Sequence, residues 1–304
     1  MIRAILSGIL AAAVSALASP AFAQDSPPAS SAGSNPAVLG PSATSPADAT
    51  ATSPAHWTDA QKEAFLLKAE VVKRRAAPGG ITNSRRATLR KDGVEHDAHI
   101  QVVDEYKSQI NLNSGLELDF RDSWRNNVAA YRLDRLLGLR MIPVTVVRVD
   151  EFKTASFTWW VDDVLMTEKE RFEKKIKSPD PDAWNRQIFV VRIFDQLIYN
   201  IDRNLGNLLI EKDWTIWMID HTRAFKIFKD LKMEKNLGTS CERDFLASLR
   251  TLTKPALVPL MKDLLAEGQV DALLARRDKI VRHYETQIAA RGEGSVLYDL
   301  PSRP

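Results

Sequence analysis

Three oxygen-bearing side chains within residues 199–225 have the types and spacing of a chemical site. Asp202 is followed at the fifth position by Asn207, and two short apolar segments then lead to Asp220. Because turn residues separate the apolar segments, the pattern predicts two short strands that set the three side chains on two loops. A phosphoryl-transfer site has this layout, since one carboxylate orients the attacking hydroxyl while an amide and a second carboxylate hold magnesium ions. The stretch therefore predicts phosphoryl-transfer chemistry.

Two other interpretations fit the same stretch. Asp and Asn satisfy backbone groups in turns and tolerate left-handed conformations, so each of the three can simply be a turn residue. Alternatively, Asp202, Asn204 and Gly206 fall on alternate positions, as the ligands of a calcium loop do, and Asp213 would be the last ligand. An EF-hand loop, however, needs Asp or Asn at its fifth place and Gly at its sixth, and here the order is reversed.

The elements around this stretch predict a mixed α+β fold. Strands are predicted over 69–75, 82–89 and 94–103, a helix over 123–139, and two further strands over 144–149 and 156–161. A buried helix over 181–200 leads into Asp202, and helices over 241–252, 255–267 and 270–291 follow Phe225. A small antiparallel sheet lobe with one helix, followed by a mainly helical lobe, is the expected architecture.

The run D-R-N-L-G-N from Asp202 to Asn207, the Ile219-Asp220 pair and this order of elements resemble the protein-kinase-like superfamily. The details resemble its atypical branches most, namely the phosphatidylinositol kinases, HipA-type kinases and secretory-pathway kinases. The resemblance implies that Asp202 is the catalytic Asp, that Asn207 and Asp220 bind Mg²⁺ or Mn²⁺, and that ATP is the nucleotide. It also implies an amino lobe over 57–165 and a carboxy lobe over 166–304.

The amino lobe departs from the family pattern at two positions. Kinases place a Lys on the third strand and a Glu on the following helix, where this sequence has Gln101 and Asn127. Both are neutral, so neither can neutralise phosphate charge. Gly79 and Gly80 are placed to cover phosphates with backbone N–H groups, although any tight hairpin uses such glycines. Gln101, Asn127 and Gly80 are therefore the predicted nucleotide-binding residues.

Other charged side chains have less defined roles. Lys107, Arg85 or Arg86 can replace the missing lysine, but each is more typical of a solvated surface charge. Arg223 is expected to pair with a carboxylate and hold its segment to the catalytic loop. His221 is expected to pack where kinases place the Phe of Asp-Phe-Gly.

Residues 1–23 have the features of a secretory signal peptide. Arg3 gives a positive start, residues 5–17 are apolar, and Ala21-Phe22-Ala23 is a small-x-small cleavage site. Residues 24–56 lack Lys and Arg and are rich in Ala, Ser, Pro and Thr, so a disordered tether is expected there. A periplasmic or secreted protein follows, without stable membrane insertion because the apolar run is short for a span.

Charge and cysteine content exclude other classes. The formal net charge of +3 is small against 27% charged residues, so the composition implies no nucleic-acid partner. Cys241 is the only cysteine in 304 residues, which rules out an internal disulfide and favours a buried thiol.

These observations leave three functional hypotheses. The first is an exported phosphotransferase that uses nucleotide and divalent metal on an acceptor that the sequence does not identify. The second is a pseudokinase that binds or scaffolds, because Gln101 and Asn127 are neutral and a periplasm is poor in ATP. The third is the calcium-loop structural protein. The oligomeric state is not determined by the sequence.

Overall fold

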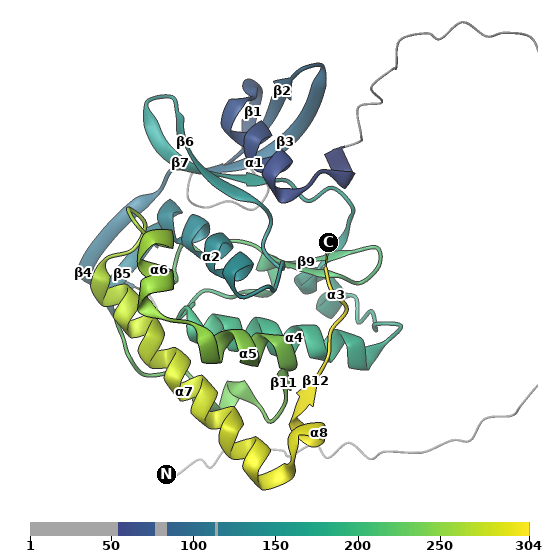
Figure 1. The fold of residues 1–304 in the computed structure, drawn as a ribbon. Coiled ribbons are helices and arrows are strands. Elements are labelled where there is room, and N and C mark those ends of the chain that lie inside the picture. Colours follow the sequence, from purple (N-terminus) through teal and green to yellow (C-terminus); the bar gives the residue numbers. More distant parts are fainter. Residues whose placement is uncertain (1–53, 77–83, 113–114, 304) are drawn as a thin grey trace, which may run out of the picture. The chain divides into compact units, whose positions relative to one another are not determined.

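The computed structural model describes residues 54–76, 84–112 and 115–303 (Figure 1). The predicted signal peptide, the predicted tether up to residue 53 and the turn that contains Gly80 lie outside these residues. Pro54–His56, the last residues of the predicted tether, form a short 3-10 turn, η1. Among the described residues, no helix has the length and apolar character needed to cross a membrane.

An antiparallel sheet forms the amino-terminal part of the fold. It has five strands in the order β1-β2-β3-β7-β6, and all neighbours are antiparallel. Its strands are β1 (Glu70–Ala76), β2 (Arg85–Lys91), β3 (Val94–Gln101), β6 (Thr145–Asp150) and β7 (Lys153–Trp159). The predicted strands of this lobe are therefore confirmed.

Helices accompany the sheet and form most of the carboxy-terminal part (Figure 1). Those of the sheet lobe are α1 (Asp59–Lys68) and α2 (Trp124–Leu136). Those that follow are α3 (Glu168–Glu173), α4 (Pro181–Leu197), α5 (Arg243–Thr251), α6 (Lys254–Leu260), α7 (Glu267–Arg291) and α8 (Glu293–Val296). Local sequence sets their starts, because Thr58 and Gln61 form a capping box at α1 and Asp180 caps α4 just before Pro181.

The two faces of β3 have different surroundings because successive side chains of a strand point to opposite faces. His96 stacks on Trp159 with ring centroids 3.6 Å apart, and Trp159 in turn contacts Phe65 of α1. His99 and Gln101 therefore lie on the face opposite α1. This second face of the sheet carries the side chains that the candidate site can use.

Two strands after α4 form the predicted hairpin. They are β9 (Leu208–Glu211) and β10 (Ile216–Met218), which pair antiparallel from Ile210–Ile216 to Leu208–Met218. A third strand, β8 (Val164–Thr167), pairs with β9 and completes a three-stranded sheet. Asn207 precedes this sheet and Asp220 follows it.

A two-stranded ribbon was not predicted. β4 (Asp104–Leu112) and β5 (Gly115–Ser123) pair antiparallel between β3 and α2, in a stretch for which no strand was predicted. Most of β4 is exposed, so the sequence lacks the apolar alternation that marks a strand with one buried face. Lys226 holds the ribbon from outside, since its Nζ donates to the carbonyls of Leu118 and Asp119.

The carboxy-terminal helices differ from prediction at their ends. The helix predicted over 255–267 stops at Leu260, one residue after Pro259, which lacks a backbone N–H and ends the hydrogen-bond ladder. Cys241, predicted to begin a helix, instead lies in β11 (Cys241–Glu242), which pairs in parallel with β12 (Leu297–Tyr298). Its thiol is buried as expected.

Candidate active site

Hydrogen bonds within the loop between α4 and β9 hold the backbone of Asp202. The Asp202 N–H donates to Asn200 Oδ1 over 3.1 Å, and the Asp202 carbonyl accepts from the Asn204 N–H at 2.8 Å. Asn207 Nδ2 also donates to that carbonyl, at 3.3 Å. The backbone of Asp202 is thereby fixed while its side chain stays exposed. An exposed, positioned carboxylate is what hydroxyl orientation requires.

Asn207 and Asp220 come together at the base of the β9–β10 hairpin. The Ile219 N–H donates to the Asn207 carbonyl over 3.1 Å. Asp220 is the next residue in the chain, so the hydrogen bond brings it close to Asn207. Asp220 has a φ of 55°, a left-handed conformation that Asp tolerates better than most residues. Because Asn207 uses its Nδ2 on the loop, its Oδ1 is the amide atom available to a cation.

The charges of Asp202 and Asp220 influence one another. Desolvation raises the pKa of Asp202 above its ordinary value, and the negative charge of Asp220 raises it further. Arg223, Arg203 and Lys232 oppose this rise in pKa with their positive charges. Asp202, Asn207 and Asp220, the three residues selected from sequence, are thus brought together by the fold.

Arg203 joins the two loops of the site and was not singled out from sequence. Its guanidinium pairs with Asp195 of α4 at 3.0 Å and donates to the carbonyls of Asn207 at 3.1 Å and Ile219 at 2.8 Å. Its Nη2 lies 2.8 Å from Nε2 of His221. In the sequence, the only indication of this role was the position of Arg203 next to Asp202, because a short loop needs a side-chain donor for its backbone carbonyls.

His221 packs in the interior as predicted. It is 1% exposed and lies edge-on to Phe194 of α4, with ring centroids 6.2 Å apart. Burial lowers the pKa of His221 well below its ordinary value, and the charge of Arg203 adds to this effect. The imidazole is therefore neutral, with Nε2 accepting from Arg203.

Asn127 lies where predicted on α2, and its contacts reach the Asp220 segment. Its Oδ1 accepts from the His221 N–H at 2.7 Å, and its Nδ2 lies 3.5 Å from Oγ of Ser156. The neighbouring Asn126 donates to the carbonyls of Thr222 and Ala224 at 2.7 and 3.1 Å. Hydrogen bonds from the start of α2 therefore hold the segment that follows Asp220.

Gln101 ends β3 opposite Ser156, the residue that Asn127 also approaches. Its Oε1 accepts from the N–H groups of Val102 and Val103, at 3.0 and 3.2 Å. The two neutral amides thus lie in one neighbourhood beneath the sheet. Gly80, the third predicted nucleotide contact, lies outside the described residues.

His99 shares a face of β3 with Gln101 and was missed at the sequence level. Desolvation lowers the pKa of His99, while the charge of Asp220 opposes that shift, so the two side chains are within electrostatic reach. Strand alternation from Gln101 was the signal available, since His99 is two residues earlier. The sheet thereby covers the Asp220 side of the site.

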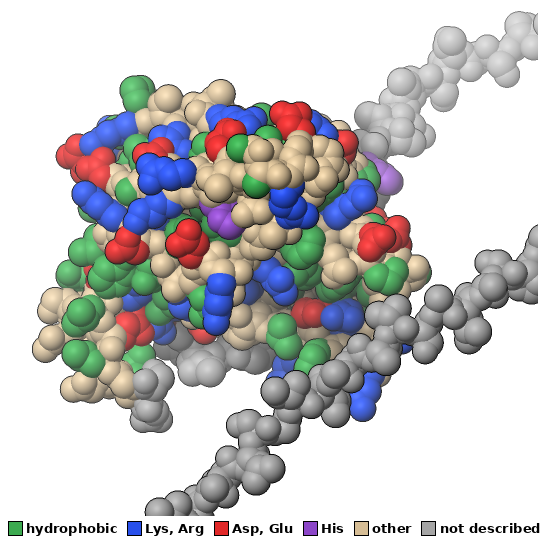
Figure 2. Space-filling view, turned by 90° about the horizontal axis from the view of Figure 1, so that it is seen from below, with side chains coloured by type: hydrophobic (Ala, Val, Ile, Leu, Met, Phe, Trp, Pro, Cys, Tyr) green, Lys and Arg blue, Asp and Glu red, His purple; other side chains and the backbone are tan. Residues whose placement is uncertain are grey.

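The basic residues considered as lysine substitutes are all paired with acids. Arg86 pairs with Asp97 at 2.6 Å and stacks on Trp160 at 3.9 Å from the ring centroid. Arg85 pairs with Glu151 at 2.7 Å, and Lys107 lies 3.4 Å from Glu105. The surface view agrees, with acidic and basic side chains intermixed on the face shown (Figure 2).

Arg223 differs from its predicted role. Its Nη2 pairs with Glu117 of β5 at 2.5 Å, so the carboxylate that holds it belongs to the ribbon and not to the catalytic loop. Lys226 shares Glu117 at 2.6 Å. Glu117 could not be predicted as this partner because the ribbon itself was not predicted.

The calcium-loop hypothesis does not fit the local structure. Asn204 Oδ1 accepts from the Gly206 N–H at 2.9 Å, and Asp213 Oδ1 accepts from the Thr215 N–H at 2.9 Å, so both side chains cap turns. Strand β9 separates them and spans roughly 13 Å at the usual rise of a strand. A single loop around one ion is therefore wrong. Among the described residues, no group of three or more His, Cys, Asp or Glu side chains is placed to hold a metal.

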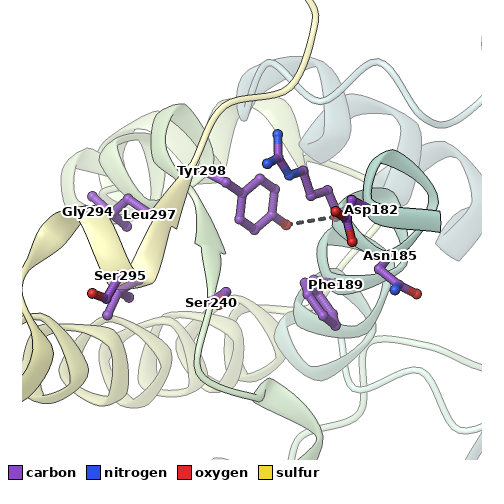
Figure 3. A pocket seen from close by; sticks show the side chains of 10 residues that line it. Asp182, Asn185, Phe189, Ser240, Gly294, Ser295, Leu297 and Tyr298 are labelled. Carbon is purple, nitrogen blue, oxygen red and sulfur yellow. Dashed lines mark hydrogen bonds between the residues drawn. The ribbon is translucent and has the colours of Figure 1, made fainter. Parts of the chain in front are cut away.

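A pocket of about 360 Å³ lies elsewhere, where the start of α4 meets α8 and β12 (Figure 3). The Tyr298 hydroxyl donates to the Arg186 carbonyl across it at 2.7 Å. None of the predicted site residues lines it. Its lining residues are Asp182, Asn185, Arg186, Phe189, Ser240, Gly294, Ser295, Val296, Leu297 and Tyr298.

Comparison with known proteins gives matches in structure only. No protein-family model and no curated protein matches the sequence. The Golgi casein kinase matches with a TM-score of 0.58 at 17% identity, over 81% of this chain and 80% of that chain. Its structure with Mn and ADP bound gives the same values. Hydra Fam20, solved with sugar, matches with a TM-score of 0.61 at 14% identity, over 78% of this chain and 91% of that chain.

The chain has a protein-kinase-like fold. The predicted α+β architecture, with an antiparallel sheet lobe and a helical lobe, is confirmed, and so is the resemblance to atypical kinases. Within this kinase-like fold, α2 is one of two helices of the sheet lobe, and the loop from Asp202 to Asn207 lies in the helical lobe. The structural matches show the fold alone, because the identities are only 14–17%, and the activity has to be argued from the site.

Proposed function

We propose that the chain is an exported, metal-dependent phosphotransferase that moves a phosphoryl group from a nucleotide to a hydroxyl acceptor. The observation that carries this proposal is the convergence of Asp202, Asn207 and Asp220, with Arg203 joining the two loops. If the three residues only formed turns, one arginine that binds both loops would not be needed. The predicted signal peptide over 1–23 supports export to a periplasm or beyond.

Each residue has a defined task in this proposal. The Asp202 carboxylate accepts a hydrogen bond from the acceptor hydroxyl and orients its oxygen for attack. Asn207 Oδ1 and the Asp220 carboxylate are oxygen ligands, which suit Mg²⁺ or Mn²⁺ because these ions use one or two carboxylates together with phosphate oxygens. The cation, when bound, neutralises charge on the phosphates. The manganese and ADP bound to the Golgi casein kinase support this cofactor choice.

In this scheme Asn127 and Gln101 hold backbone segments in place and do not neutralise phosphate charge. Asn127 holds the His221 N–H next to Asp220, and Gln101 orders the end of β3. Neither amide supplies the positive charge of the usual lysine. Phosphate neutralisation therefore depends more heavily on the cation than in kinases with that lysine. We expect the affinity for ATP to depend on the bound metal.

The second candidate function is a pseudokinase that binds or scaffolds. It is favoured by the same amides, since the hydrogen bonds of Gln101 to Val102 and Val103 occupy its acceptor oxygen. In that case the three site residues would persist without turnover. The two candidates differ in one measurable property, which is phosphoryl transfer in the presence of bound nucleotide.

Thermal shift and turnover assays with ATP and Mn²⁺ or Mg²⁺ separate the candidates. Ligand at 100 times its Kd stabilises a protein by about 2.7 kcal/mol, so binding raises the Tm. Asp220→Ala is expected to abolish both the shift and turnover. Asp202→Ala is expected to keep the shift and to lose about 10²- to 10⁴-fold in rate.

The matched control is Asp213→Asn, because Asp213 is an exposed acid on the β9–β10 turn outside the site. It should leave the shift and the rate unchanged. A shift without turnover supports the pseudokinase. No shift with any nucleotide and metal contradicts the phosphotransferase and supports a pseudokinase that has lost nucleotide binding.

A further inference from the structure

Asp122 is a buried acid that the site described so far does not use. It is the residue before Ser123, which caps α2, and it is 9% exposed. Its Oδ1 has no hydrogen-bond partner. Burying a carboxylate oxygen without a donor or cation is costly, and buried charges are normally paired or bind metals.

The unpartnered carboxylate lies beside Asp220. The Thr222 hydroxyl donates to Asp220 Oδ1 at 3.1 Å. The Ser123 N–H fixes this arrangement by donating to the Thr222 carbonyl at 3.0 Å. The two carboxylates are also within electrostatic reach of one another, since the charge of Asp220 acts on Asp122. Like charges this close favour either a proton or a cation between them.

The nearest positive side chain is directed elsewhere. Arg223 influences Asp122 through its charge, but its Nη2 is paired with Glu117 at 2.5 Å. Its Nε is buried without a partner, so it does not reach Asp122 Oδ1 in this arrangement. Among the described residues, Asp122 therefore forms no ion pair.

We propose that Asp122 and Asp220 together bind a divalent cation, Mn²⁺ or Mg²⁺, which loads before nucleotide. Two carboxylates from separate elements match the oxygen preference of these ions, and water fills the remaining positions until phosphate arrives. Asp122 lies on β5 and Asp220 follows β10, so the bound ion links the ribbon to the helical lobe. The inference rests on the proposed function only for the role of Asp220 as a metal ligand.

Binding of Mn²⁺ to the full chain without nucleotide tests this inference, with free Mn²⁺ measured by electron paramagnetic resonance. Asp122→Asn is nearly isosteric and is expected to weaken Mn²⁺ binding tenfold or more. Asp122→Glu keeps a carboxylate, so it should retain measurable binding and shows whether a defect of the Asn variant comes from folding. The control is Glu105→Gln, which changes the acid opposite Asp122 on β4 and should alter binding less than twofold.

Each outcome decides the inference. Mn²⁺ binding by Asp122→Asn equal to that of the wild type overturns it, and a proton on Asp122 or an ion pair with Arg223 then explains the buried acid. Absence of Mn²⁺ binding by the wild type at low-millimolar concentration also overturns it. Asp122-dependent Mn²⁺ binding without any phosphotransfer supports the cation site while the proposed function fails. Nucleotide turnover together with Mn²⁺ binding that does not depend on Asp122 supports the proposed function and overturns the cation site.

Discussion

Asp202 is an exposed acid whose ionisation is tuned by its neighbours, and this makes its proposed role testable by pH. A group that orients a hydroxyl must be ionised, so activity is lost as pH falls through its pKa. Desolvation and Asp220 raise the pKa of Asp202, whereas Arg223 lowers it. The acid limb of kcat/KM should therefore lie above the pH range of an unperturbed Asp.

Arg223→Gln should move this limb to higher pH. Removing a positive charge disfavours the ionised form of Asp202, so its pKa rises further and less of the active form is present at a given low pH. The measurement is the pH dependence of kcat/KM, with Lys107→Gln on the exposed ribbon as a control for general charge. A limb that stays in place or moves to lower pH contradicts the role of Asp202.

Arg203 provides a second prediction at the residue scale. Its pair with Asp195 is largely buried, with side chains 12% and 10% exposed. Arg203→Met leaves the Asp195 carboxylate without its partner and is expected to lower the free energy of unfolding by about 3–5 kcal/mol. Arg203→Lys keeps the charge and should lose less.

Urea unfolding of the two variants checks this expectation. Arg192→Met is the matched control, since Arg192 is exposed on the same helix, α4, and should change stability by less than about 0.5 kcal/mol. Equal stability of Arg203→Met and wild type would show that the arginine does not anchor the loops.

At the scale of elements, the sequence predicted those whose own pattern determines them. The apolar spacing of α4 and the short strands β9 and β10 is local, so the helix and hairpin that present Asp202, Asn207 and Asp220 could be found by inspection. The ribbon could not, because β4 is exposed and its partner strand β5 is held by Lys226, which is distant in sequence. The partner of Arg223 and the setting of Asp122 were missed for the same reason.

The contact between α2 and the Asp220 segment is likewise non-local, and it yields a prediction. Asn127→Ala leaves the buried His221 N–H without its acceptor, which costs about 1–3 kcal/mol. Hydrogen exchange of a peptide covering 219–226 should speed up in this variant. Asn111→Ala, on the exposed end of β4, is the control and should leave exchange in 219–226 unchanged. Unaltered exchange in the Asn127 variant would mean that α2 does not hold the segment.

Across the molecule, the two lobes share one buried apolar cluster. It includes Ile100 of the sheet, Val128 of α2 and Phe194 of α4. The core therefore continues from the sheet that covers the site into the helix that delivers Asp202. The sequence patterns of the separate elements do not indicate this continuity, which depends on how the elements pack in three dimensions.

The carboxy-terminal segment adds a second connection between the lobes. From α8 it runs back along the helical lobe to β9 and β10, where Arg303 lies (Figure 1). The Arg303 guanidinium donates to the carbonyls of Arg140 at 2.9 Å and Ile216 at 2.7 Å, and it lies 5.1 Å from the Trp217 ring centroid. Arg140 follows α2 of the sheet lobe, whereas Ile216 belongs to the hairpin that leads to Asp220.

Arg303→Ala should therefore lower stability although Arg303 is remote in sequence from the site. Hydrogen bonds from a charged donor contribute about 1.5–3 kcal/mol, so we expect a loss of roughly 2–3 kcal/mol. For a domain of this size that corresponds to a fall in Tm of roughly 4–12 °C, measured by calorimetry. Arg303→Lys keeps the charge with a single donor group and should fall between. Arg291→Ala removes an exposed arginine with one 3.5 Å contact, so its Tm should match the wild type. If Arg303→Ala melts with the wild type as well, the carboxy-terminal segment does not stabilise the contact between the lobes.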